Sequence, residues 1–269
     1  MAPPEPAHAP DPAVEVITMT ATTVTRTGPR ADRAGTRAAR RHFTRALILT
    51  GIWFWGFWAA LVVGVPLAVD RWGGEMAGLT YDTAGNPARW VGFAVGIILT
   101  AAALRMHVAA GGTRRAFVDG ATRAAAVVGV AYGVLTVVLV LAEEQLYAGL
   151  DRGWQGSATT VDLDSVGGVL VSVGAETLVL VTYLLAGVGV VTGYRRFGAS
   201  RGTLLVVPLL VPCTLVDAAT RTGVAGIPWR GGYDDVTTGA LLGVGGSLVV
   251  AAATYLLIIR LLRSVPLRP

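Results

Sequence analysis

Six long apolar runs, separated by short polar loops, constrain this chain more than any other feature. The runs cover residues 46–68, 90–110, 124–146, 166–191, 203–216 and 237–262. A helix needs about 20 residues, at about 1.5 Å each, to cross a hydrocarbon core of about 30 Å. Most of the runs reach that length. The sequence therefore predicts an all-α polytopic membrane protein with six transmembrane helices.

The fifth run is shorter than the others and carries Pro208 and Pro212. Proline inside a helix removes a backbone hydrogen bond and clashes with the preceding turn. We expect a short, kinked or broken helix here, which reaches spanning length only if it continues to Asp217 or beyond.

The arginines indicate the orientation. The chain has no lysine, so all 22 basic side chains are arginines. Seventeen of them lie in the N-terminal arm, the second and fourth loops and the C-terminal tail, and five lie in the other loops. Because cytoplasmic loops are enriched in arginine and lysine, we expect both termini in the cytoplasm. Most acidic residues, and many tryptophans and tyrosines, lie near the opposite ends of the runs.

Residues 1–35 contain several prolines and lack the apolar core of a signal peptide, so we expect a disordered cytoplasmic arm before a membrane domain at residues 36–269. The pI near 9.9 is explained by arginines beside the membrane that face anionic lipid, and we expect no nucleic-acid partner. The use of arginine alone and the Ala, Gly and Val bias suggest a high-GC bacterial genome. The bacterial plasma membrane is the expected location.

Several kinds of chemistry are excluded. The single cysteine, Cys213, rules out an internal disulfide and a thiolate metal cluster, and three scattered histidines do not suggest a metal site. Without lysine there is no P-loop, and there is no Gly-x-Ser-x-Gly nucleophile motif. We therefore expect no cofactor and no enzymatic activity in the chain itself.

Glycines four residues apart recur within the runs. Such pairs let helix backbones approach closely. They are Gly92 with Gly96, Gly129 with Gly133, and Gly239 with Gly243.

The second cytoplasmic loop, at about residues 105–123, is the most distinctive segment. It contains the pattern Gly-x-Thr-Arg-Arg-x-Phe between two apolar runs. Thr113 is the expected N-cap of a helical turn that runs along the membrane surface and presents Arg114, Arg115 and Phe117 to the cytoplasm.

This pattern, followed by an apolar helix that ends in an acid, resembles the membrane subunits of ATP-binding cassette exporters of the type-2 export family. The resemblance implies that the loop docks on a separate ATPase subunit and couples ATP binding to helix movement. The matching positions are Gly112, Thr113, Arg114, Arg115 and Phe117, with Glu143 or Glu144 as the terminal acid.

Other features extend the resemblance. The basic amphipathic segment at residues 36–45 resembles the interfacial elbow helix of that family, with Arg40, Arg41, Phe43 and Arg45 as its defining residues. The stretch at residues 217–235 resembles a segment that holds short re-entrant helices. The long arm before Thr36 is a departure. The implied partners are a separate ATP-binding subunit, a second identical or similar permease, and membrane lipid.

Three acids are candidates for an intramembrane site or pathway: Glu143, Glu144 and Glu176. Glu176 lies about ten residues inside the fourth run, where an ionised carboxylate costs about 2.5–3.5 kcal/mol on insertion scales. We expect it to face the bundle interior or a subunit interface. It is either protonated or hydrogen-bonded to Ser172, Thr177 or another hydroxyl, and serves either packing or a pathway.

Glu143 and Glu144 lie at the outer end of the third run. Paired glutamates occur in glutamic intramembrane proteases, but those need an arginine at the position of Ala148. We therefore expect a solvated pair rather than a protease.

The sequence thus predicts the permease subunit of an exporter. The alternative is an integral membrane protein with a regulatory or scaffolding role, and a secondary transporter is a third possibility. Apolar drugs, peptides and lipids all suit the expected cavity.

Overall fold

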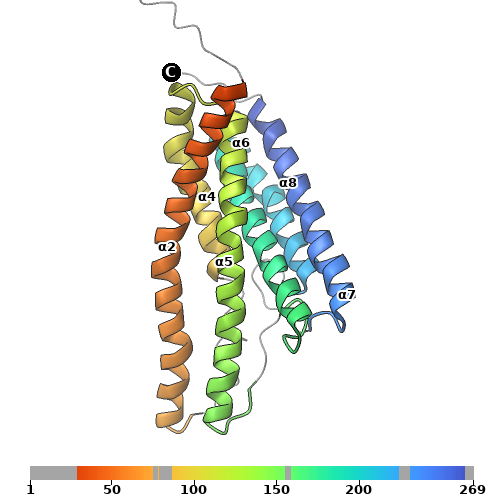
Figure 1. The fold of residues 1–269 in the computed structure, drawn as a ribbon. Coiled ribbons are helices and arrows are strands. Elements are labelled where there is room, and N and C mark those ends of the chain that lie inside the picture. The colour runs from red at the N-terminus through yellow and green to blue at the C-terminus, as the bar shows by residue number, and fades with distance from the viewer. Residues whose placement is uncertain (1–28, 75–77, 79–86, 155–158, 224–230, 264–269) are drawn as a thin grey trace, which may run out of the picture.

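The fold is a bundle of long helices (Figure 1). The computed structural model describes residues 29–74, 78, 87–154, 159–223 and 231–263. Its elements are α2 (Pro29–Arg71), α4 (Pro87–Ala109), α5 (Arg114–Gly149), α6 (Val166–Thr220), α7 (Val236–Thr238), the π-helix η1 (Gly239–Gly245) and α8 (Gly246–Arg263). The last three are continuous, and five helices are long and apolar enough to cross a membrane. The predicted all-α class is confirmed for the described residues, and the length and composition of these helices are compatible with a multi-pass membrane protein.

The longest element, α6, is a helical hairpin. Gly198 leaves the helical conformation, with φ 77°, a region that glycine enters at little cost. The arms before and after it run antiparallel, because Tyr194 hydrogen-bonds Thr203 near the bend and Tyr183 hydrogen-bonds Asp217 far from it. The fifth apolar run is the second arm.

The predicted effect of the two prolines is corrected by this arrangement. Pro208 and Pro212 lie inside α6, and the break falls at Gly198 instead. A transmembrane helix tolerates an internal proline where neighbouring helices or hydroxyl side chains satisfy the carbonyls that the proline leaves without a donor. The second arm continues past Asp217 to Thr220, as spanning length requires.

The first helix also corrects a prediction. Residues 36–45 do not form a separate elbow helix, because α2 is continuous from Pro29 to Arg71, and residues 29–35 belong to it rather than to a disordered arm. No proline or glycine interrupts residues 36–50, so nothing in the sequence stops the helix there. The amphipathic pattern is confirmed, since Phe43 is buried while Arg40, Arg41 and Arg45 are exposed. Residues 1–28 lie outside the described part.

Helices α2 and α5 run side by side in the same direction (Figure 1). At one end Thr113 donates a hydrogen bond to Asp32, at 2.8 Å. Near the middle the Tyr132 hydroxyl, on α5, donates to a backbone carbonyl of α2 at 3.1 Å. The other end is closed by Arg152 and Asp70, at 2.8 Å. The pair is therefore fastened along its whole length.

The predicted glycine pairs mark real contact faces. A side chain at any of these glycines would meet a neighbouring segment. The neighbours are Leu180 for Gly92, Leu184 for Gly96, Thr177 for Gly129, Val173 for Gly133, Val161 for Gly239 and Thr160 for Gly243. Two of the three pairs thus let α4 and α5 approach the first arm of α6 closely.

The predicted re-entrant helices at residues 217–235 are absent from the described positions, because residues 217–220 are the end of α6 and residues 221–223 and 231–235 are not helical. Residues 224–230, where the prediction also fell, lie outside the described part. Tyr233 donates its backbone N–H to Thr160, at 2.8 Å, and Arg221 lies over the Tyr233 ring at 4.3 Å. Asp235 then caps α7, and hydrogen bonds from Thr238 lower the pKa of its carboxyl.

Candidate functional site

A buried ionic cluster joins α4 to both arms of α6. Arg89, the third residue of α4, donates from Nη2 to Glu176 Oε1 at 2.7 Å and from Nη1 to Asp217 Oδ1 at 2.9 Å. Glu176 lies on the first arm of α6 and Asp217 near the end of the second. One guanidinium therefore links three helical segments.

A fourth member completes the cluster. The Tyr183 hydroxyl donates to Asp217 Oδ2 at 2.6 Å, and the ring packs edge-on against Trp90 at 5.4 Å. Cys213 lies one turn before Asp217 and is buried in the same apolar cluster as Tyr183. The thiol is a small packing residue, as its position in the run predicts.

Burial makes this cluster energetically expensive to disturb. The side chains of Arg89, Glu176 and Asp217 are 2%, 13% and 0% exposed. Removing one partner from a buried ion pair typically costs about 3–5 kcal/mol, because the other charge is left without compensation. Two carboxylates face one cation, so the cluster holds an excess of negative charge whenever both acids are ionised.

The cluster confirms one prediction and replaces another. Glu176 faces the bundle interior as its depth predicts, but its partner is Arg89 and not a hydroxyl. Thr177 donates instead to the backbone of Val173, and Ser172 to the backbone of Val161.

Arg89 and Asp217 were missed as site residues because each lies next to a predicted loop. A long side chain at a helix end can reach inward, and sequence position does not show it. The available signal was that Arg89 is one of only five arginines in the loops predicted to be poor in positive charge.

The second candidate site is the tight turn from α4 to α5. Gly111 turns the chain with φ 84°. Thr113 is the N-cap of α5, as predicted, and accepts a hydrogen bond from the N–H of Ala116 at 3.1 Å. Its hydroxyl also donates to Asp32 of α2 at 2.8 Å. Gly112 packs against His107.

The two arginines of this turn differ in role. Arg114 donates to the backbone carbonyl of Leu262, the penultimate residue of α8, at 2.8 Å. Arg115 is 73% exposed and lies 3.9 Å from Asp119. Asp119 accepts a hydrogen bond from Tyr255 of α8 at 2.5 Å. The turn is thus tied to α2 and α8, and Arg115 points away from the bundle.

The prediction that Phe117 is presented to the cytoplasm is wrong. Phe117 is 1% exposed and packs edge-on against Phe43 of α2, at 5.3 Å, and against His107, at 5.4 Å. The predicted turn along the membrane surface is the first part of α5 itself, so Phe117 faces inward one turn after the N-cap. Its aromatic ring fills the bundle end and is not free to dock on another protein.

The two glutamates near the C-terminal end of α5 differ in burial. Glu143 is fully buried and accepts a hydrogen bond from the Trp154 indole at 3.3 Å, so the expected solvated pair is wrong for this residue. Glu144 is partly exposed. Successive helix residues point about 100° apart, so the two carboxylates cannot share one environment.

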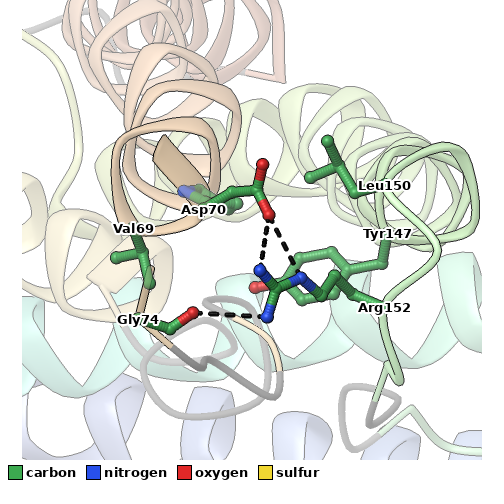
Figure 2. A pocket seen from close by; sticks show the side chains of 7 residues that line it. Val69, Asp70, Gly74, Tyr147, Leu150 and Arg152 are labelled. Atoms are coloured by element: carbon green, nitrogen blue, oxygen red, sulfur yellow. Dashed lines mark hydrogen bonds and ion pairs between the residues drawn. The ribbon is translucent and has the colours of Figure 1, made fainter. Parts of the chain in front are cut away.

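A small pocket lies at the C-terminal end of α5, the end that carries Glu143 (Figure 2). Arg152 reaches across it and donates to Asp70 from Nε at 3.1 Å and from Nη2 at 2.8 Å, and to the Gly74 carbonyl at 3.4 Å. Figure 2 shows Tyr147 and Leu150 on the α5 side of this contact. The arrangement fastens the tips of α2 and α5 together and leaves little room for a ligand.

No protein-family model, curated protein or solved structure matches the chain. Within the described ranges, no group of three or more His, Cys, Asp or Glu side chains is placed to hold a metal ion.

Proposed function

We propose that the chain is the permease subunit of an ATP-binding cassette exporter in a bacterial plasma membrane. In this proposal the two arms of α6 each span the membrane, which gives six spans with both termini in the cytoplasm. The subunit pairs with a second permease and with separate ATPase subunits. The chemistry belongs to the ATPase.

The observation that carries the proposal is the anchoring of the α4–α5 turn. Thr113 binds α2 and Arg114 binds the end of α8, while Arg115, which lies beside Asp119, is 73% exposed and accessible to a partner. A force applied at this turn reaches two further helices, α2 and α8, through direct hydrogen bonds. The resemblance to the coupling loop of type-2 exporters rests on the same residues, with Phe117 supporting the turn from inside.

The buried ionic cluster favours a transporter over a scaffold. Charged residues inside a membrane bundle are costly, and they commonly mark pathways for ions or substrates. Here Arg89 connects α4 with both arms of α6, the segments whose relative position would change when a pathway opens.

The test is association with an ATP-binding cassette ATPase encoded beside the gene. Both proteins are co-expressed, and the affinity of the purified complex is measured in nanodiscs. Arg115→Glu reverses the one exposed charge of the turn, so the Kd should rise about tenfold or more, equivalent to about 1.4 kcal/mol or more.

Arg201→Glu is the matched control, because Arg201 is also exposed and lies at the hairpin bend of α6. It should leave the Kd within about twofold of the parent value, a change of about 0.4 kcal/mol. Equal binding by the parent and Arg115→Glu, with both correctly inserted, would contradict the proposed coupling role.

A further inference from the structure

A groove between α2 and α5 carries three arginines that form no ion pair with any other described residue. It is lined by Arg40, Arg41, Thr44 and Arg45 of α2 and by Val127 of α5, and it has a volume of about 380 Å³. Small-molecule sites typically have about 300–1,000 Å³. The groove lies where the apolar run of α2 begins, at residue 46.

The positive charge of the groove is not neutralised within the described residues. None of the ion pairs or side-chain hydrogen bonds there uses the guanidinium of Arg40, Arg41 or Arg45. Arg41 and Arg45 are one helical turn apart, a spacing at which like charges repel. A bound anion would relieve this repulsion, and guanidinium groups bind phosphate oxygens with two parallel hydrogen bonds.

An apolar track continues from the groove. Ile48 and Ile52 of α2 are 48% and 65% exposed, and Val130 and Val134 of α5 are 49% and 44% exposed. They follow Thr44 and Val127 at helical spacing, on the faces that line the groove. Because α2 and α5 run in the same direction (Figure 1), both rows of side chains extend from the groove along the exposed surface of the apolar runs. Val127 itself is 64% exposed at the start of the track.

We infer that this groove is a binding site for the phosphate headgroup of one anionic phospholipid, whose acyl chains lie along the apolar track between α2 and α5. The arginines recognise the phosphate, the Thr44 hydroxyl supplies a further polar group, and the valines and isoleucines contact the chains. Such a lipid would occupy the groove between α2 and α5 at the membrane interface. The site does not depend on an ATPase partner.

The experiment uses the full chain, purified in detergent, titrated with phosphatidylglycerol or phosphatidylcholine. Binding is followed by native mass spectrometry and by the melting temperature. We expect one phosphatidylglycerol to bind with saturation and to raise the melting temperature, and phosphatidylcholine to bind more weakly. An interfacial arginine contributes about 1 kcal/mol to anionic-lipid binding, so Arg41→Gln with Arg45→Gln should weaken phosphatidylglycerol binding roughly 30-fold.

The matched control is Arg260→Gln with Arg263→Gln, which removes the same charge from exposed residues in the last turn of α8. It should keep the parent affinity. An equal loss in both double variants would show only diffuse attraction and would overturn the site. Unchanged binding by Arg41→Gln with Arg45→Gln would overturn it as well.

Two further arms define the ligand. Val127→Asp keeps every arginine but places an acid in the groove, so it should also abolish the saturable binding while helix content is retained. Inorganic phosphate should leave the melting temperature unchanged at concentrations where phosphatidylglycerol saturates. If phosphate alone reproduced the full shift, the occupant would be a free anion, and the assignment to a lipid would be wrong.

Discussion

At the scale of single residues, the guanidinium of Arg89 holds the buried ionic cluster together. It contacts Glu176 and Asp217 on the two arms of α6, and both contacts are shorter than 3 Å. Asp217 is fully buried and also accepts a hydrogen bond from the Tyr183 hydroxyl, whereas the Glu176 side chain is 13% exposed. The two acids therefore depend on Arg89 to different degrees.

Arg89→Gln should lower the free energy of unfolding by about 3–5 kcal/mol, because two buried carboxylates lose their only described cationic partner. Asp217→Asn should cost more than Glu176→Gln, since it weakens the contacts to both Arg89 and Tyr183. The measurement is reversible denaturation in mixed micelles. Parent-like stability of Arg89→Gln would show that the cluster does not hold α4 against α6.

At the scale of elements, the α4–α6 contact depends on glycine. A Cβ at Gly96 would meet the backbone of Leu184, whereas one at Gly64 of α2 would meet nothing within 4 Å. Gly96→Ala should lower the free energy of unfolding by about 1–3 kcal/mol, because the added methyl group overpacks the contact. Gly64→Ala should be neutral or stabilise by up to about 1 kcal/mol, because alanine is the better helix former. The melting temperature should therefore fall for Gly96→Ala and stay unchanged or rise for Gly64→Ala. Equal shifts in the two variants would contradict the described packing.

The start of α5 makes a second prediction at this scale. Phe117→Ala empties a buried contact with Phe43, so it should cost about 3–5 kcal/mol. Arg115→Ala, at an exposed position nearby, should change stability by less than about 0.5 kcal/mol. Thermal unfolding in detergent without any partner measures both. If Phe117→Ala were as mild as Arg115→Ala, the ring would not be part of the core.

The sequence predicted the elements better than their ends. Apolar runs and glycine pairs identified the helices and the faces on which they pack, because length and spacing express those constraints locally. The sequence did not show that α2 continues from residues 36–45 into the first apolar run without an elbow. The helical spacing of the residues is the same in both segments, so it marks no boundary between them. The inward turn of Phe117 and the partners of Glu176 were not accessible either. Both depend on contacts between segments 74 and 87 residues apart in the chain.

At the scale of the whole molecule, the described ends of the chain lie together. Asp32 near the start of α2 and Leu262 near the end of α8 both bind the α4–α5 turn. The hairpin bend of α6 lies toward the same end of the bundle, because Arg195, three residues before Gly198, donates to the Ala101 carbonyl in the second half of α4. In the proposed topology this end is cytoplasmic, as the arginine distribution predicts.

Cysteine labelling tests that orientation. In a Cys213→Ser background, Asp164→Cys should react with an impermeant thiol reagent in intact cells, and Ser200→Cys should react only after the membrane is opened. Both positions are exposed, so a difference in labelling reports the side of the membrane and not burial. Labelling of Ser200→Cys alone in intact cells would reverse the topology and place the α4–α5 turn outside.

The most direct test of the coupling role is a photo-cross-link from the turn itself. A photoreactive amino acid replaces Arg115 in the full chain, which is co-expressed in intact cells with the ATP-binding cassette ATPase proposed as its partner. A second sample carries the same group at Asp164, on the opposite end of the bundle. If the turn docks on the ATPase, position 115 should form an adduct with the ATPase and position 164 should form none. An ATPase that co-purifies with the chain but cross-links only from position 164, or from neither position, would contradict it.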